Sequence, residues 1–216
     1  MALLYVIDSI AIESPRAYYL DSKGGDDSNS GRTPSSAWRT IGKINSIALA
    51  PGDSIYFRRG GIWRETLEPQ RGGTAGHPIV FTAYGTGPAP IITGSDLVDG
   101  WSLSTESVYR ARSSKPNNIY VDGGPGWGLT HACCLPGESC ARSGLCAIGP
   151  MSAGSWYWNP ATSDLYVWLE DSSNPAHHTV EAAVRIYGMN ATATEDEKGN
   201  IIVDGLDFER VGGYGI

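Results

Sequence analysis

Residues 51–60 read PGDSIYFRRG, and the fold class follows from this stretch and from the similar runs after it. A Pro-Gly-Asp turn leads into a short run of β-branched and aromatic residues, which ends at a second turn. Further runs of this kind lie at residues 63–67, 79–83, 91–93 and 118–121. Short strands separated by Gly-rich turns predict an all-β protein, and a sandwich, a barrel and a solenoid fit the pattern equally well.

One amphipathic helix is predicted ahead of these strands. Ser35 or Ser36 can cap it, apolar residues recur three and four positions apart between residues 38 and 48, and Ala-Pro-Gly at 50–52 ends it. A helix in this position can cover the open apolar end of a solenoid. We therefore expect an N-terminal capping α-helix.

Composition and charge limit the classes of partner. The chain has 216 residues, of which 41% are hydrophobic, and it carries a net charge of −7. It contains no basic cluster of the kind that binds nucleic acid or an anionic membrane, and no apolar run long enough to span a bilayer. We expect neither partner, and we interpret residues 1–17 as a leader or a first strand.

Four cysteines lie within fourteen residues, in a Gly- and Pro-rich stretch that follows His131. They are Cys133, Cys134, Cys140 and Cys146. An even number of cysteines in a loop without a core of its own favours two disulfides and an oxidising compartment, so we expect an extracellular or periplasmic protein. Zinc binding through His131 and three thiolates, or free thiols, are the alternatives, although the spacing lacks the paired C-x-x-C of most structural zinc sites.

A hairpin is predicted at residues 154–169, where two aromatic strands flank a turn. Trp156 and Trp158 share one strand face, and Tyr166 and Trp168 share one on the partner strand. These rings either stack against sugar rings or form the core that holds the hairpin in place.

The last stretch of the chain, residues 200–216, alternates between apolar and charged residues and contains the candidate catalytic pair, Asp207 and Glu209. Residues i and i+2 of a strand share a face and lie about 6.5–7 Å apart. Glycoside hydrolysis needs two carboxyl groups at such a separation, one as the acid and one as the nucleophile or base. The alternative is that both residues are ordinary solvent-facing charges.

Two further features bear on a lyase reaction, which requires a cation and a basic side chain to remove a proton next to a uronate carboxylate. Arg185 and Arg210 are the candidate basic residues, and ordinary surface arginines are the alternative. The acidic stretch at 21–31 suggests a calcium site, but Asp, Asn, Ser and Gly are also the residues that turns require. We expect no cofactor, and calcium stays open.

Several stretches together resemble the opening of pectate-lyase-like right-handed parallel β-helix proteins. They are YYLD at 18–21, GDDSNSG at 25–31, AWRTI at 37–41 and PGDSIYFRRG at 51–60. GHPIVFTAYG at 76–85 and IVDGLDF at 202–208 look like further coils of that fold. The hairpin is similar to an insertion in β-helix glycoside hydrolases.

The resemblance implies a truncated right-handed parallel β-helix with an inserted antiparallel hairpin. Residues 18–122 would form the cap and first coils, residues 123–178 the inserted cysteine loop and hairpin, and residues 179–216 further coils that end mid-coil. It also implies a secreted carbohydrate-active protein that acts on a polysaccharide or oligosaccharide. A glycoside hydrolase is favoured, and a uronate lyase with Ca²⁺ and a non-catalytic glycan-binding module are the alternatives.

In the hydrolase interpretation, Asp207 and Glu209 are catalytic, and the inserted hairpin forms one wall of a sugar cleft. The residues expected to contact the sugar are Trp156, Trp158, Tyr166, Trp168 and Arg185. A coil that ends without a cap exposes apolar surface and strand edges, so we also expect self-association at the C-terminal end.

Overall fold

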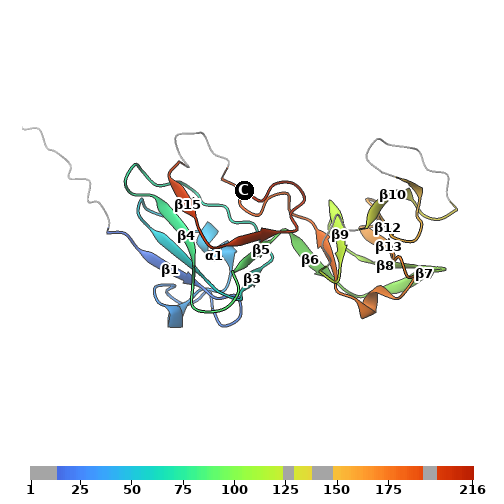
Figure 1. The fold of residues 1–216 in the computed structure, drawn as a ribbon, viewed down its shortest axis with the longest axis horizontal. Helices are drawn as coiled ribbons and strands as arrows, with labels where there is room; N and C mark the ends of the chain where they lie inside the picture. The colour runs from blue at the N-terminus through green and yellow to red at the C-terminus, as the bar shows by residue number, and fades with distance from the viewer. Residues whose placement is uncertain (1–13, 124–128, 138–147, 192–198) are drawn as a thin grey trace, which may run out of the picture. The chain divides into compact units, whose positions relative to one another are not determined.

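The computed structural model of the chain describes residues 14–123, 129–137, 148–191 and 199–216. Strands hold 39% of the residues and helices 6%, so the prediction of an all-β protein is confirmed. The chain divides into two compact units, which Figure 1 shows as a ribbon. The first unit contains residues 1–61, 69–90 and 191–206, and the second contains residues 62–68, 91–190 and 207–216.

The first unit is built on a parallel four-stranded sheet. Its strands, in spatial order, are β1 (Ala17–Leu20), β2 (Ser54–Arg58), β4 (Ile79–Tyr84) and β15 (Ile201–Val203). The prediction of a strand directly after the Pro-Gly-Asp turn is confirmed by β2. Figure 1 shows β15, from near the end of the chain, in the same sheet as β1.

The turn before β2 is fixed by Asp53, whose side chain is completely buried. Its Oδ1 atom accepts a hydrogen bond of 2.7 Å from the Arg16 backbone N–H, and its Oδ2 atom accepts one of 2.8 Å from that of Ala50. Gly52 has a φ of +90°, which a residue with a side chain rarely adopts. The Pro-Gly-Asp sequence therefore sets both the bend and the start of the strand.

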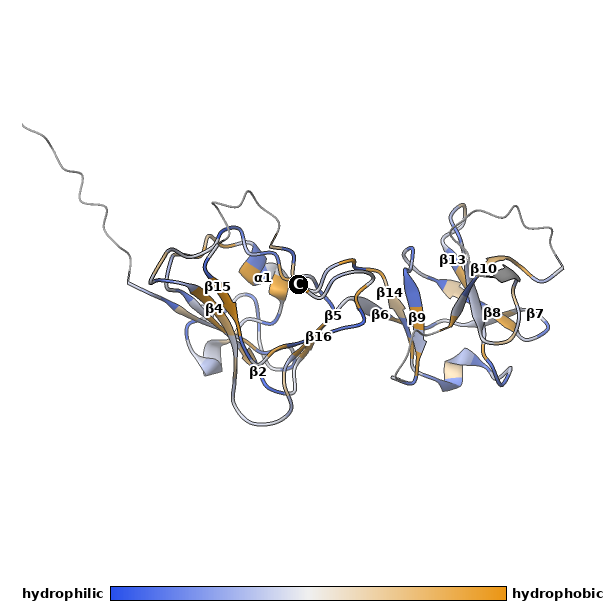
Figure 2. Ribbon diagram, turned by 45° about the horizontal axis from the view of Figure 1, so that its top comes forward, coloured by the Kyte–Doolittle hydropathy of each residue, from blue (hydrophilic) through white to orange (hydrophobic). Residues whose placement is uncertain are grey.

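The parallel strands pair in a register that places apolar residues side by side on one face of this sheet. Ile55 lies beside Tyr18 on one side and Phe81 on the other, and Phe81 lies beside Val203. Ile55 and Phe81 are fully buried, whereas the alternate residue Tyr56 is partly exposed. Figure 2 shows how strongly apolar residues concentrate in β4 and β15. Burial of this apolar face, at about 25 cal/mol per Å², stabilises the unit.

The predicted long helix is wrong in its extent. The structure has a 3₁₀ helix, η1 (Pro34–Ser36), and a short α-helix, α1 (Ile41–Asn45), which Thr40 caps by accepting a hydrogen bond from the Lys43 N–H. Trp38 separates them because its backbone pairs like a strand: its N–H donates to the Tyr19 carbonyl at 2.9 Å, and its carbonyl accepts from the Asp21 N–H at 2.8 Å. These tertiary hydrogen bonds override the helical periodicity.

The second unit contains a parallel sheet of three short strands, β3 (Ile62–Trp63), β5 (Ile91–Thr93) and β16 (Asp207–Glu209), with β5 in the middle. The chain visits the two parallel sheets alternately: β2 is followed by β3, β4 by β5, and β15 by β16. The strand predicted at 63–67 is shorter than expected and ends at Trp63.

Two further sheets complete the second unit. One is antiparallel and has the order β6 (Ser95–Val98), β14 (Val180–Ala183) and β9 (Asn118–Val121). The other has the order β11 (Ile148–Pro150), β10 (Thr130–Cys134), β12 (Ser155–Asn159), β13 (Asp164–Trp168), β8 (Val108–Arg112) and β7 (Ser102–Thr105). The predicted hairpin is confirmed by the antiparallel pair β12 and β13. Its sheet also takes in β7 and β8, which precede residue 123.

Several predictions lie outside what the described residues test. Cys133 and Cys134 belong to β10, but Cys140 and Cys146 lie outside the described residues, so the disulfides stay a prediction. The same holds for residues 1–13 of the expected leader, for the capping role of α1 and for self-association. Among the described residues, no helix is long and apolar enough to cross a bilayer.

Candidate functional site

The predicted catalytic carboxylates lie on β16, in the parallel sheet of the second unit. Asp207 lies beside Ile91 of β5, and Glu209 lies beside Thr93. Asp207 is exposed, and the Glu209 side chain is 40% exposed. Because the two residues are two apart on one strand, their Cα atoms are about 6.5–7 Å apart and their side chains point to the same face. The pair is therefore accessible and has a spacing compatible with attack on a glycosidic bond.

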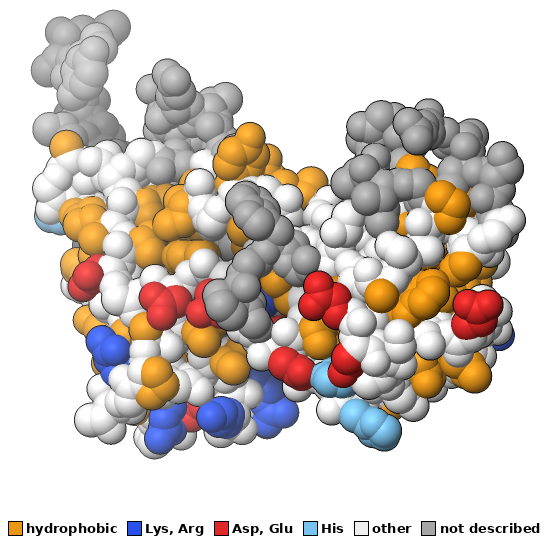
Figure 3. Space-filling model, turned by 45° about the vertical axis from the view of Figure 1, so that its right-hand side comes forward, with side chains coloured by type: hydrophobic (Ala, Val, Ile, Leu, Met, Phe, Trp, Pro, Cys, Tyr) orange, Lys and Arg blue, Asp and Glu red, His pale blue; other side chains and the backbone are white. Residues whose placement is uncertain are grey.

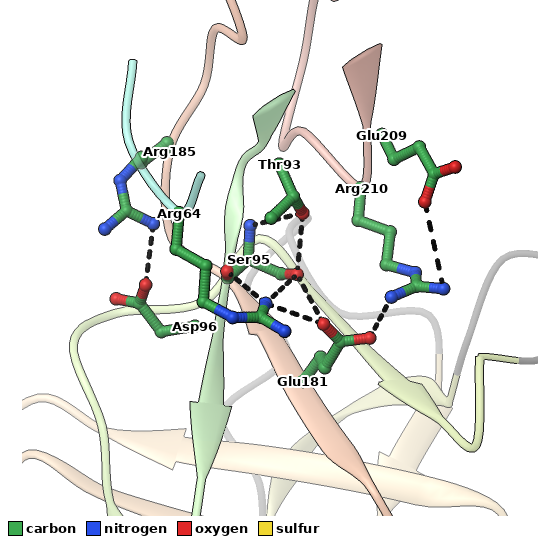
Figure 4. A network of polar contacts seen from close by, with 8 residues as sticks. All are labelled: Arg64, Thr93, Ser95, Asp96, Glu181, Arg185, Glu209 and Arg210. Atoms are coloured by element: carbon green, nitrogen blue, oxygen red, sulfur yellow. Dashed lines mark hydrogen bonds and ion pairs between the residues drawn. The ribbon is translucent and has the colours of Figure 1, made fainter. Parts of the chain in front are cut away.

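Arg210 connects this strand to a buried acidic residue. Its φ of +48° is in the left-handed region, and its Nη2 atom lies 4.0 Å from the Glu209 carboxylate. Its Nη1 atom contacts the carboxylate of Glu181 on β14. The guanidinium carbon also lies 5.9 Å from the centre of the Tyr120 ring. One arginine thus touches both carboxylates, as Figure 4 shows.

Glu181 is the centre of the network in Figure 4, and it is only 2% exposed. Its Oε1 atom accepts a hydrogen bond of 2.7 Å from Arg64 and one of 3.3 Å from the Ser95 hydroxyl, which lies 3.0 Å from that of Thr93. The other carboxylate oxygen contacts Arg210. Burying an ion without partners is very costly, so the two guanidinium groups are what makes a charge at this position tolerable.

Gly94 lies between β5 and β6, where the backbone is packed too closely for a side chain. Its carbonyl accepts hydrogen bonds from the N–H groups of Val184 and Arg185, and its own N–H donates to the Glu209 carbonyl, all at 3.0 Å. A Cβ atom at residue 94 would lie 2.7 Å from the Val211 Cα atom. This glycine lets β16 and β14 approach β5 and β6, and so brings Glu209, Arg210 and Glu181 together.

Arg185, predicted to contact a sugar, lies beside this network but pairs with another residue. Its Nη1 atom is 2.8 Å from Asp96, and the Arg185 side chain is 26% exposed. The Arg185 charge is therefore already matched by a carboxylate. The structure adds Arg64 and Glu181 to the candidate site. The sequence signal that could have identified Glu181 is its position in an otherwise apolar strand. An acidic residue buried in such a strand requires a cationic partner.

The four predicted aromatic residues lie in two apolar clusters of the second unit. Trp156 is 3% exposed and packs with Leu165, Val167 and Val180, and Trp158 packs against the same cluster. The partner strand's Tyr166 and Trp168 belong to a second cluster.

Each indole of this hairpin donates a hydrogen bond: that of Trp156 to the Leu129 carbonyl at 3.0 Å, that of Trp158 to the Ser113 carbonyl at 3.2 Å, and that of Trp168 to the Ser172 hydroxyl at 3.0 Å. These contacts hold the hairpin in its sheet. Sugar stacking stays a prediction for the partly exposed rings.

The acidic stretch at 21–31 uses its carboxylates to order turns. Asp26 accepts hydrogen bonds from the Ser28 N–H and hydroxyl, and the hydroxyl contact is the main reason that the pKa of Asp26 lies below its usual value. Asp27 accepts from the Thr40 hydroxyl at 2.7 Å and from the Arg39 N–H at 2.8 Å. Among the described residues, no three His, Cys, Asp or Glu side chains are grouped so as to hold a metal ion.

The sequence is similar to part of one curated carbohydrate-active enzyme. A stretch of 112 residues is 36% identical to the lacto-N-biosidase of Bifidobacterium longum subsp. longum, and the match covers 49% of this chain and 7% of that protein. The sequence match supports a relationship to glycoside hydrolases. No protein-family profile matches the chain.

Two solved structures share the fold at low sequence identity. The complex of XylC with xylose has a TM-score of 0.68 and 19% identity, over 92% of this chain and 36% of that chain. A structure named as a glycoside hydrolase has a TM-score of 0.58 and 11% identity, over 91% of this chain and 51% of that one. The chain spans only a small part of the lacto-N-biosidase and about a third to a half of these two structures.

Proposed function

We propose that this chain is part of a secreted glycoside hydrolase that acts on oligosaccharides or polysaccharides. The observation that carries the proposal is the 36% identity to a lacto-N-biosidase over 112 residues. The accessible carboxylate pair on β16 supports it, because hydrolysis of a glycosidic bond needs an acid and a nucleophile or base. The four clustered cysteines support secretion, since disulfides persist in oxidising compartments.

The fold that we propose is a right-handed parallel β-helix with an antiparallel insertion. It is supported by the order in which the chain enters the two parallel sheets: three successive rounds each give one strand to the first sheet and the next strand to the second. Parallel pairing in register between rounds is the arrangement that a solenoid of stacked coils requires. The strands between β5 and β15, which pair antiparallel except where β10 meets β11 and β12, would form the insertion.

In the proposed reaction, Asp207 and Glu209 lie on either side of the glycosidic oxygen and the anomeric carbon. One carboxylic acid donates a proton to the leaving oxygen while the other carboxylate attacks the anomeric carbon or activates water. Arg210 would hold the Glu209 side chain in place, and Arg210 is itself held by the buried Glu181. The separation of about 6.5–7 Å lies at the lower end of the range for inverting enzymes, about 6.5–9.5 Å.

A reducing-sugar assay on the chain, and on the full-length protein that contains it, tests this proposal over neutral and acidic oligosaccharides. Asp207→Asn and Glu209→Gln should each lower the turnover by at least about a hundredfold, the typical contribution of acid–base catalysis. Asp204→Asn is the matched control, because Asp204 is exposed and lies just before β16. Full activity in both site variants would refute the assignment of the pair.

The lyase and binding alternatives predict different results in the same experiment. A uronate lyase would release unsaturated products that absorb in the ultraviolet, and chelation of calcium would abolish their formation. A non-catalytic module would bind oligosaccharides and release no product. Hydrolysis with a new reducing end, and without an unsaturated product, is the result that we expect.

A further inference from the structure

The outer face of the first unit's parallel sheet carries a cluster of three tyrosines. Tyr19 of β1 lies beside Tyr56 of β2, and their ring centres are 5.1 Å apart at an interplanar angle of 15°. Tyr84 of β4 meets Tyr19 edge-on, with 5.3 Å between the ring centres. All three residues are partly exposed. They form a half-exposed aromatic surface of the kind that contacts the apolar faces of sugar rings.

The hydroxyl of Tyr84 has an unusual environment. It is buried, and it has no hydrogen-bond partner among the described residues. Burial is the main cause that raises the pKa of Tyr84, and the nearby charge of Asp21 adds to it. Buried hydroxyl groups in proteins nearly always have a partner. The Tyr84 hydroxyl is therefore an unpaired polar group that a ligand on the surface does not reach.

A pocket of about 460 Å³ lies where β1 and β2 of this sheet end, and its lining is strongly basic. Lys23, Arg58 and Arg59 line it together with one acidic residue, Asp21, so the pocket carries two net positive charges in a chain whose net charge is −7. Arg58 belongs to both features, because it lines the pocket and lies beside Tyr84 in the sheet. Figure 3 shows Lys and Arg side chains gathered at the lower left of the face that it draws.

The basic side chains of the pocket are not equivalent. Asp21 accepts hydrogen bonds from the N–H groups of Lys23 and Gly24 at 3.0 Å and from Arg58 at 2.7 Å, so Arg58 is held in position. Lys23 and Arg59 have no ion-pair partner among the residues that the structure describes. Lys23 and Arg59 can therefore both contact an anion in the pocket, beside the Arg58 guanidinium that Asp21 holds in place.

We propose that this surface binds an acidic glycan, with sugar rings against Tyr19 and Tyr56 and an anionic substituent, a carboxylate or a sulfate, in the pocket beside Arg58 and Arg59. The identity of the ligand as a glycan rests on the proposed function. Binding at this surface requires no hydrolysis, so a chain without hydrolase activity would leave the present proposal standing.

Calorimetric titration of the chain with three trisaccharides tests the proposal: one of galacturonic acid, one of sulfated galactose and one of neutral galactose. The first two distinguish a carboxylate from a sulfate as the preferred group. We expect at least one acidic trisaccharide to bind about tenfold more tightly than the neutral one, as one charge-assisted hydrogen bond would give. Its affinity should fall as salt is raised, because screening weakens exposed charge pairs.

Arg59→Gln should weaken binding of the acidic trisaccharide by about three- to tenfold, because one charged contact is lost. Arg71→Gln is the matched control, since it removes one exposed arginine of the same unit that does not line the pocket. Inorganic sulfate should bind more weakly than the sulfated trisaccharide. Equal affinity for the neutral and acidic sugars, equal effects of the two arginine variants, or sulfate binding as tight as that of the sulfated sugar would each overturn the proposal.

Discussion

Replacing Glu181 by Gln gives the sharpest test of the buried network, because the change keeps the shape of the side chain and removes only its charge. Two guanidinium groups would then share a neutral amide in place of a carboxylate. Breaking a buried ion pair from one side costs about 3–5 kcal/mol. Arg64 and Arg210 are 29% and 25% exposed, so water can solvate part of their charge. We therefore expect the lower end of that range, about 3 kcal/mol of unfolding free energy.

The free energy of unfolding can be followed by tryptophan fluorescence in urea, with thermal unfolding as a second measure. A loss of about 3 kcal/mol corresponds to a fall in Tm of roughly 6–12 °C for a chain of this size. Glu106→Gln is the control, because Glu106 is an exposed acidic residue of the same unit, and its variant should stay within about 0.5 kcal/mol of the parent. If the unfolding free energy of Glu181→Gln also stays within 0.5 kcal/mol of the parent, the network around Glu181 does not stabilise the fold.

Three other predictions use the same unfolding measurements. Gly94→Ala should destabilise the chain by about 1–3 kcal/mol, because the added Cβ would lie 2.7 Å from the Val211 Cα atom; a neutral effect would mean that the backbone there yields easily. Tyr84→Phe should leave stability unchanged or raise it by about 1 kcal/mol, since it removes an unpaired buried hydroxyl; a clear loss of stability would contradict this account of the hydroxyl. Burial opposes ionisation of Asp21, but hydrogen bonds from its neighbours and the Arg58 guanidinium outweigh it and hold its pKa below the ordinary value. Ionised Asp21 should therefore contribute its full stabilisation above about pH 4, the pKa of the unfolded state, and this stabilisation should be lost as the pH falls through the lower pKa of the folded state. Asp21→Asn should remove this part of the pH dependence of the unfolding free energy. If the unfolding free energy of the variant falls with acid as much as that of the parent, the assignment to Asp21 is wrong.

Local patterns predicted local structure well in this chain. The strand after the Pro-Gly-Asp turn and the hairpin at 154–169 both depend on residues close together in sequence, and both are confirmed. The predicted helix failed at Trp38 for the opposite reason. Its apolar spacing is helical, but backbone hydrogen bonds to Tyr19 and Asp21, nearly twenty residues away, hold it extended. No window of sequence around Trp38 contains those partners.

The candidate site shows the same limit more clearly. Glu209 was found because strand alternation places it beside Asp207 on one face, which is a property of neighbouring residues. Glu181 was missed because its partners come from elsewhere: Arg64 lies 117 residues away along the chain, Ser95 lies 86 away and Arg210 lies 29 away. The sequence does show an acidic residue within an apolar strand, and such a residue requires a cationic partner. It does not show which residues are the partners.

Arg210 connects the buried network around Glu181 to the proposed catalytic pair. Its guanidinium contacts buried Glu181 on one side and lies 4.0 Å from Glu209 on the other. In Glu181→Gln, Arg210 loses its stronger anchor and Glu209 becomes the only carboxylate near it among the described residues. If the carboxylate pair on β16 is catalytic, turnover of the folded variant should therefore fall while its affinity for substrate changes little. Equal loss of affinity and turnover would show that the network supports only the fold.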